Sequence, residues 1–190
     1  QVLKNLNEAY NLDASNWEQY VDYMSGLLRG DLGPSFRFPG RSVTEMITTG
    51  LPVTFELAFY AILIALFMGV FSGVLAALKR NTFLDFIPMA IAMIGICVPT
   101  FLMGPLLVLI FGINLELLPV SGWDNLPGDK ILPSITLGFA YAAYIARLSR
   151  GGMLEILGQD FIRTARAKGL SERVVVTKHA MQGGLIPVVS

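Results

Sequence analysis

Charge, cysteine and histidine are scarce in this sequence. Charged residues make up 15% of the 190 residues and hydrophobic residues 54%, a balance outside that of ordinary soluble domains. The single cysteine, Cys97, excludes a disulfide framework and a thiolate metal site. Because Cys97 stands in an apolar run, we expect it to be buried as a small hydrophobic side chain.

The motifs of several enzyme classes are also absent. The sequence contains no Gly-x-x-x-x-Gly-Lys-Ser/Thr loop, so we do not expect it to bind ATP by that device. It has no His-Glu-x-x-His zinc motif, and its only histidine, His179, is interpreted as a surface residue of a basic helix. A nucleophilic triad needs a further histidine or carboxylate pattern. We therefore predict a protein that is not an enzyme, without catalytic residues, a metal site or a cofactor of its own.

Long apolar stretches without charge fill much of the chain. About 20 such residues suffice to cross the ~30 Å hydrocarbon layer of a membrane as a helix. We therefore predict an all-α, polytopic transmembrane helical bundle. The spans are expected at about residues 51–78, 86–113 and 131–147, with the start of another near residue 183.

Glycine and proline interrupt these spans at informative places. Gly69 and Gly73 form a Gly-x-x-x-Gly spacing that lets another helix approach closely, although glycine is also common in membrane helices generally. Pro88, Pro99 and Pro105 fall in the second span, and we expect a kink or break near Pro99. Such a kink fits either a pathway-lining segment or ordinary helix bending, and both interpretations stay open.

The net charge of zero hides an asymmetry between loops. If the basic pair Lys79-Arg80 faces the cytoplasm, nine of the 14 basic residues and only four of the 14 acidic residues lie on that side. Residues 1–50 then form an external segment, with a helix capped by Asp13 or Ser15, and residues 51–190 form the transmembrane domain. Residues 155–180 form a cytoplasmic loop, called the 155–180 loop below.

The two ends of the chain are abrupt. It begins with Gln1 in a segment assigned to the external side, and a chain that starts there needs an earlier span or signal. It stops at Ser190, just after another apolar element begins. We expect a fragment of a longer protein, the alternative being a native chain of unusual topology.

The 155–180 loop has the pattern of a docking element. Residues 161–168 are predicted to form a helix that ends at Gly169, a residue suited to positive φ, and a second helix follows from Ser171. Small and apolar side chains between basic ones fit insertion into a groove of another protein. The alternative is an amphipathic loop packed on its own bundle. Contact with anionic membrane lipid is expected, and nucleic-acid binding is not.

The loop resembles the cytoplasmic coupling loop of ABC importer permeases. That family reads Glu-Ala-Ala, three residues, Gly. Ala165 and Gly169 agree with it, whereas Arg163 and Thr164 depart from it. The family's Ile-x-Leu-Pro, ten residues after the glycine, is replaced by the stretch 179–182. The stretches FIRTARAKGL and HA, with GDLGPSF and AALK earlier in the chain, are instead similar to the oligopeptide/dipeptide branch and its B-type permease subunit.

The resemblance implies an ABC importer type I permease fold and a function in peptide uptake. It implies a second homologous permease subunit, two ATPase subunits that use ATP and Mg²⁺, and an external binding protein that delivers the peptide. The location would be the cytoplasmic (inner) membrane of a prokaryote. The residues that would contact the ATPase are Arg163, Thr164, Ala165, Arg166, Ala167, Lys168, Gly169 and Leu170.

Other functions stay open on the sequence alone. Nickel or another small solute is an alternative cargo within the same family, and a secondary transporter or a membrane enzyme is a more distant alternative. A secondary transporter normally places ionisable residues in its spans, and the span centres here have none. From polarity and position we predict five pathway-lining residues: Tyr60, Pro99, Phe101, Tyr141 and Tyr144.

Overall fold

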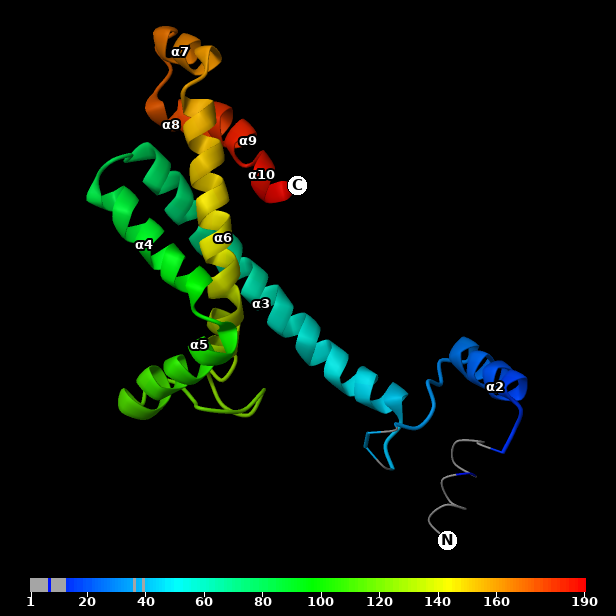
Figure 1. Ribbon diagram of the computed structural model, residues 1–190. Coiled ribbons are helices and arrows are strands. Elements are labelled where there is room, and N and C mark those ends of the chain that lie inside the picture. The colour runs from blue at the N-terminus through cyan, green and yellow to red at the C-terminus, as the bar shows by residue number, and fades with distance from the viewer. Residues whose placement is uncertain (1–6, 8–12, 36, 39) are drawn as a thin grey trace. The chain divides into compact units, whose positions relative to one another are not determined.

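The computed structural model describes residues 7, 13–35, 37–38 and 40–190 (Figure 1). The regular elements in these ranges are helices, and the prediction of an all-α fold is confirmed. The chain divides into two compact units, residues 1–56 and 57–190. Parts of the predicted external segment, residues 1–6 and 8–12, lie outside the described residues, and its place outside the membrane stays a prediction.

The first unit contains helix α2, Asn16–Leu28. Of the two predicted caps, Ser15 is the one used: its hydroxyl accepts the Glu18 N–H at 3.3 Å, and the Glu18 carboxylate accepts the Ser15 N–H at 2.9 Å. This reciprocal pair is a capping box, and its hydrogen bonds lower the pKa of Glu18. Trp17 and Tyr20 stack on the exposed apolar side of the helix, with ring centroids 5.7 Å apart.

Helix α3, Val43–Leu78, is one continuous helix of 36 residues. The helix begins eight residues before the span predicted at about residues 51–78, and Pro52 therefore lies inside it and not at its start. Threonine hydroxyls bond to backbone carbonyls on both sides of Pro52: Thr48 to Thr44 at 2.9 Å and Thr54 to Gly50 at 2.9 Å. A membrane environment favours continuing the helix in this way, since backbone groups need partners there.

The second predicted span is broken. Helix α4, Phe83–Cys97, is followed by α5, Thr100–Leu107, and by the π-helix η1, Val108–Asn114, after a bend of 111°. The break at Val98 and Pro99 was predicted. Val98 is extended, as is favoured before proline, and Pro99 has no N–H to continue the helix.

The expected burial of Cys97 is wrong, because the structure exposes it. It lies in the last turn of α4, on a face different from that of Gly95. A side chain at Gly95 would meet Phe139 at 2.8 Å, so the buried face of this turn points at Phe139 and Cys97 points away from it.

Helix α6, Ile131–Leu157, lies at the centre of the second unit (Figure 1). Its buried residues are mostly small, and glycines of other helices face them. A Cβ at Gly69 of α3 would lie 2.8 Å from the carbonyl oxygen of Ala142, and one at Gly73 would overlap the Ala146 carbonyl. The Gly-x-x-x-Gly pair is therefore a packing face, where small residues let the backbones approach closely.

The spans have the dimensions of an integral membrane protein. Helices α3 and α6 are each long and apolar enough to cross a membrane, and the bent pair of α4 with α5 and η1 makes a third candidate. Helix α6 runs ten residues beyond the predicted span end at 147, to Leu157. Arg147 and Arg150 are therefore helical residues of α6, and the chain leaves the helix only after Leu157.

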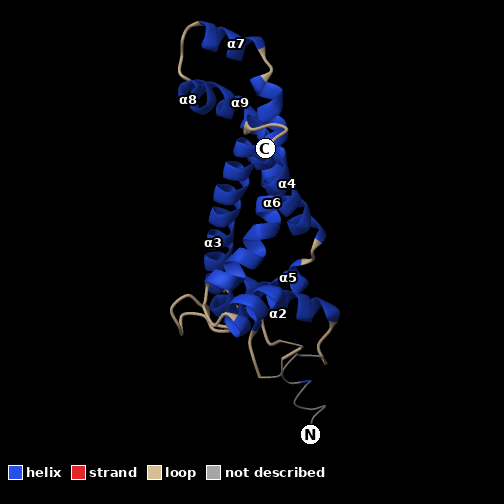
Figure 2. Cartoon of the chain, turned by 90° about the vertical axis from the view of Figure 1, so that its left-hand side faces the viewer, coloured by secondary structure: helices blue, strands red, loops and turns tan. Residues whose placement is uncertain are grey.

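Short helices follow α6. They are α7 (Asp160–Ala167), α8 (Glu172–Val174), the π-helix η2 (Val175–Ala180), α9 (Met181–Gly184) and α10 (Ile186–Val189). Both views place α7 beyond the end of α6 (Figures 1 and 2). The chain then returns to α6, where Gly184 of α9 lies against Gly152 so closely that a Cβ on Gly152 would overlap the Gly184 carbonyl.

Neighbouring glycines of α6 provide a matched test of this packing. Gly152→Ala is expected to destabilise the protein by about 1–3 kcal/mol, because the added methyl group meets backbone that must shift. Gly151→Ala meets nothing within 4 Å and is expected to stabilise the helix by up to about 1 kcal/mol. Thermal unfolding of the purified protein in detergent measures both. Equal midpoints for the two variants would contradict the close α6–α9 contact.

Candidate functional site

The 155–180 loop is built around the two-turn helix α7. The helix begins after Gln159, which is extended, and carries Asp160 in its first turn and Arg166 in its last, charges that suit the helix dipole. It ends as predicted at Gly169, where φ is +77°. The Leu170 N–H turns back toward the carbonyl of Ala165, at 3.4 Å, so the glycine reverses the chain.

The inner face of α7 is anchored in an apolar cluster, called the loop cluster below. Its buried members are Ala77, Met153, Ile162, Ala165, Val175 and Ala180. They come from the end of α3, the end of α6, α7 and η2, so one cluster joins the loop to two candidate spans. Ile162 is 0% exposed and Ala165 is 6% exposed. Ala165, one of the predicted ATPase contacts, therefore packs against its own chain.

The outer face of α7 and the turn after it carry the other predicted contacts. These exposed residues are Arg163, Thr164, Arg166, Ala167, Lys168, Gly169 and Leu170. Phe161, which the prediction did not include, is 49% exposed beside them. The result is a surface of basic and apolar side chains with a small residue, Ala167, among them.

Arg166 has a partner within the chain. Its guanidinium donates to the Glu172 carboxylate, with Nε 2.7 Å from Oε1 and Nη2 3.3 Å from Oε2. The hydrogen bond lowers the pKa of Glu172 and raises that of Arg166. This pair spans the Gly169 turn and ties the end of α7 to the start of α8. Arg166 therefore shapes the turn. Arg163 makes only an exposed pair with Asp160, at 3.4 Å, on the outer face of α7, and Lys168 is exposed beside it.

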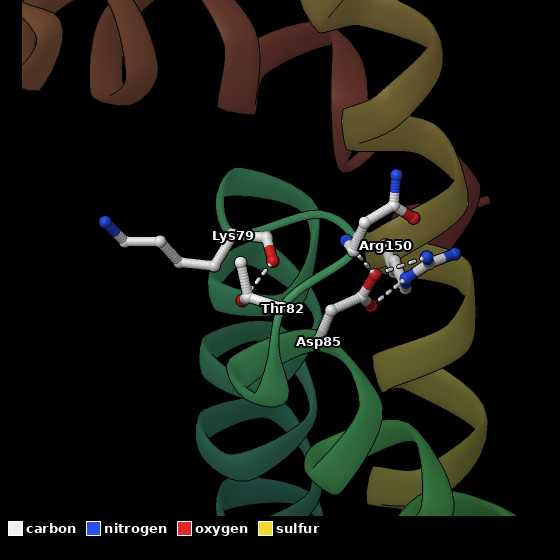
Figure 3. Close-up of polar contacts among 5 residues, drawn as sticks. Lys79, Thr82, Asp85 and Arg150 are labelled. Atoms are coloured by element: carbon white, nitrogen blue, oxygen red, sulfur yellow. Dashed lines mark hydrogen bonds and ion pairs between the residues drawn. The ribbon is translucent and has the colours of Figure 1, made fainter.

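Sequence reasoning missed a second ion pair, between Asp85 of α4 and Arg150 of α6 (Figure 3). The Arg150 Nε lies 2.6 Å from Asp85 Oδ1, and its Nη2 lies 2.8 Å from Oδ2. Asp85 is 1% exposed, and its Oδ2 also accepts the Asn81 N–H at 3.0 Å. The sequence signal for this pair is two opposite charges at the ends of apolar stretches, which the absence of charge in the span centres does not reveal.

The five predicted pathway residues do not form one surface. Tyr60 borders an apolar hollow of about 540 Å³ between α3 and α6. Phe101 borders a separate hollow of about 420 Å³, with Pro99 at the break just before it. Tyr141 and Tyr144 are 61% and 53% exposed on α6, three residues apart, away from both hollows. Their role in a pathway stays a prediction.

Known proteins match this chain along its length. The family model described as "Binding-protein-dependent transport system inner membrane component" matches residues 66–190. The chain is 44% identical over 189 residues to the dipeptide transport system permease protein of Bacillus subtilis (strain 168). It is 43% identical over 191 residues to the oligopeptide transport system permease proteins of Salmonella typhimurium and Escherichia coli K12.

These alignments cover the whole of this chain but only part of each relative. The matched share is 100% of this chain, 61% of the Bacillus protein and 62% of the other two. The family match includes all of α6 and the entire 155–180 loop. Helix α7 and the loop cluster that supports it therefore both lie in the part of the chain that the family model matches.

Ile162 and Phe161, which are adjacent in α7, test which face of the helix is buried. Ile162→Ala is expected to cost about 2–5 kcal/mol of stability, because it opens a cavity in the loop cluster. Phe161→Ala, on the outer face, is expected to change stability by no more than about 0.5 kcal/mol. Chemical or thermal unfolding in detergent measures the difference. A Phe161 variant that is the more destabilised of the two would show that α7 packs with the opposite face.

The Arg166–Glu172 pair gives the turn a defined pH dependence. Because the folded pKa of Glu172 lies below the ordinary value of 4.5, the stabilisation is complete above 4.5 and is lost as pH falls through the folded pKa. Hydrogen exchange of the amides from 166 to 172, corrected for intrinsic rates, should accelerate over that window. Glu172→Gln should exchange faster at neutral pH and lack the step. A wild-type step that survives in this variant would assign it to another group.

Proposed function

The chain belongs to the family of binding-protein-dependent transport system inner membrane components, and from this membership we propose that it is a permease subunit of an ATP-driven peptide importer. The dipeptide and oligopeptide permeases among its relatives favour peptide over nickel or another small solute as the cargo. The proposed location is the inner membrane of a prokaryote, with the 155–180 loop in the cytoplasm.

The observation that carries this proposal is the two-faced construction of α7. One face is fixed in the loop cluster by Ile162 and Ala165, and the other presents Phe161, Ala167 and Lys168. A helix mounted on its own spans with a free basic and apolar face suits a groove in a partner protein. The partner is an ATPase subunit, which supplies the nucleotide-binding loop that this sequence lacks.

Helix α6 is the proposed route from the ATPase to the pathway. It has 27 residues, which corresponds to about 40 Å at 1.5 Å per residue. Met153, near its end, lies in the loop cluster, and Leu132, at its start, borders the hollow that contains Phe101. A displacement of α7 would therefore move a rigid rod that reaches that hollow, the kind of element that a conformational switch uses.

The remaining partners are proposed to contact the outer faces of the spans. Phe67, Phe71 and Met93 are strongly exposed and suit lipid or a second, homologous permease subunit. Tyr141, Tyr144 and Arg147 recur every third residue on an exposed side of α6, and this polar stripe suits a shared, water-accessible pathway better than lipid. An external binding protein would deliver the peptide, and two ATPase subunits would complete the importer.

Substitution at Ala167 tests the docking role. Ala167→Trp adds bulk to the exposed face, whereas Ala167→Ser keeps the residue small and serves as the control. Affinity purification of the full-length protein in mild detergent should recover ATPase with the wild type and the Ser variant. The Trp variant should lose most of it while retaining its unfolding midpoint. Gly169→Asp is less suitable, because φ of +77° there adds backbone strain.

Uptake by the purified complex tests the function itself. Vesicles that contain the wild-type complex and the binding protein should accumulate labelled peptide only when ATP is enclosed with the ATPase subunits. Recovery of no ATPase with the wild type, or uptake that continues without ATP, would contradict the proposal. Accumulation of nickel in place of peptide would contradict the assigned cargo.

A further inference from the structure

The Asp85–Arg150 pair joins three segments through one carboxylate. Asp85 is the third residue of α4, Arg150 belongs to α6, and Asn81 lies in the turn after α3. The Asp85 carboxylate accepts two hydrogen bonds from Arg150, at 2.6 and 2.8 Å, and one from the Asn81 N–H, at 3.0 Å. Asn81 has φ of +61°, a region that asparagine enters more readily than other residues except glycine, and the Asp85 carboxylate also holds this turn through the Asn81 N–H.

The pair lies about two turns before the end of α6, on the side of the 155–180 loop. Arg150 lies one turn before Met153, whose side chain is fully buried in the loop cluster with Ile162 of α7. On the other side of the pair, α4 runs without interruption from Asp85 to the break at Pro99. Direct contacts therefore connect α7 to α6, α6 to α4 through the ion pair, and so to the break at Pro99.

The other contacts between α4 and α6 are of a different kind. Ala92 of α4 packs on Ala143 and Ala146, and Gly95 lies against Phe139. Apolar contact is not directional, so this close packing holds the two helices together without a bond that fixes their relative orientation. A bidentate guanidinium–carboxylate pair fixes distance and orientation together. In this interface the ion pair adds a directional link between α4 and α6.

We propose that Asp85 and Arg150 are positioning residues that pass movement of the 155–180 loop to α4 and the break at Pro99. This inference rests on the proposed function of the chain as a permease. Arg150 retains 30% of its side-chain exposure, and Arg80 in the neighbouring turn acts electrostatically on Asp85.

A role in stability alone predicts a different experimental result from a role in coupling. Buried ion pairs are weak evidence for stabilisation, since well-packed apolar residues often replace them without loss. If the pair only stabilised the fold, its loss would lower ATP hydrolysis and peptide uptake in proportion. If it transmits movement, ATP hydrolysis continues while uptake fails. The ratio of peptide taken up to ATP hydrolysed therefore separates the two roles.

The experiment uses the complete importer in vesicles with binding protein and labelled peptide. Asp85→Asn and Arg150→Lys are compared with the wild type. Arg150→Lys keeps the charge but loses the two parallel hydrogen bonds. Lys79→Gln is the control, because Lys79 lies in the same turn with its side chain directed away from the pair (Figure 3). Peptide per ATP should fall at least about fivefold in both pair variants, the lower end of typical coupling effects, and stay unchanged in the control.

The ratio of peptide taken up to ATP hydrolysed in the variants decides between coupling and stability alone. An unchanged ratio in assembled variants, even with a lower unfolding midpoint, would overturn the inference and leave a stabilising pair. If Asp85→Asn does not assemble, the Arg150→Lys ratio decides, and the exchanged pair Asp85→Arg with Arg150→Asp should recover part of the coupling. Failure of the wild-type complex to take up peptide with ATP would instead refute the proposed function, before any variant is compared.

Discussion

Close approach of the helices to α6 is the constraint on which the second unit depends. Glycines of three other helices face α6 so closely that an added Cβ would overlap its atoms. They are Gly69 and Gly73 of α3, Gly95 of α4 and Gly184 of α9. In a membrane the apolar side chains gain nothing by leaving lipid for another helix, so association relies on van der Waals contact between surfaces that fit. The positions of α3, α4 and α9 therefore depend on the glycines with which they face α6.

This packing attaches the 155–180 loop firmly to α3 and α6. Because the loop cluster includes residues of α3 and α6 as well as α7, the exposed face of α7 is attached to the membrane-spanning part and not to a free connection. The Arg166–Glu172 pair sets the turn beyond α7, and the Asp85–Arg150 pair orients α4 relative to α6. Both of these directional pairs lie toward the loop end of the unit.

Much of this arrangement could be predicted from the sequence. Uncharged runs located the spans, Pro99 located the break, and Gly169 located the end of α7, because each depends on local chemistry. The continuity of α3 through Pro52 could not be predicted, since it depends on the environment that satisfies the backbone. The Asp85–Arg150 pair joins residues 65 positions apart, and the inward direction of Ala165 depends on Val175 and Met153. Such contacts arise only when the segments fold together.

Helix α3 shows a consequence of packing by size. Its buried residues, as described, are alanine and glycine only, whereas Phe67 and Phe71 stand outward with 74% and 63% exposure. Large side chains outside and small ones inside reverse the arrangement of a water-soluble helix. The inner face of such a span is therefore encoded by side-chain volume and not by polarity. A tryptophan scan would outline the interior of this protein more clearly than a scan with charged residues.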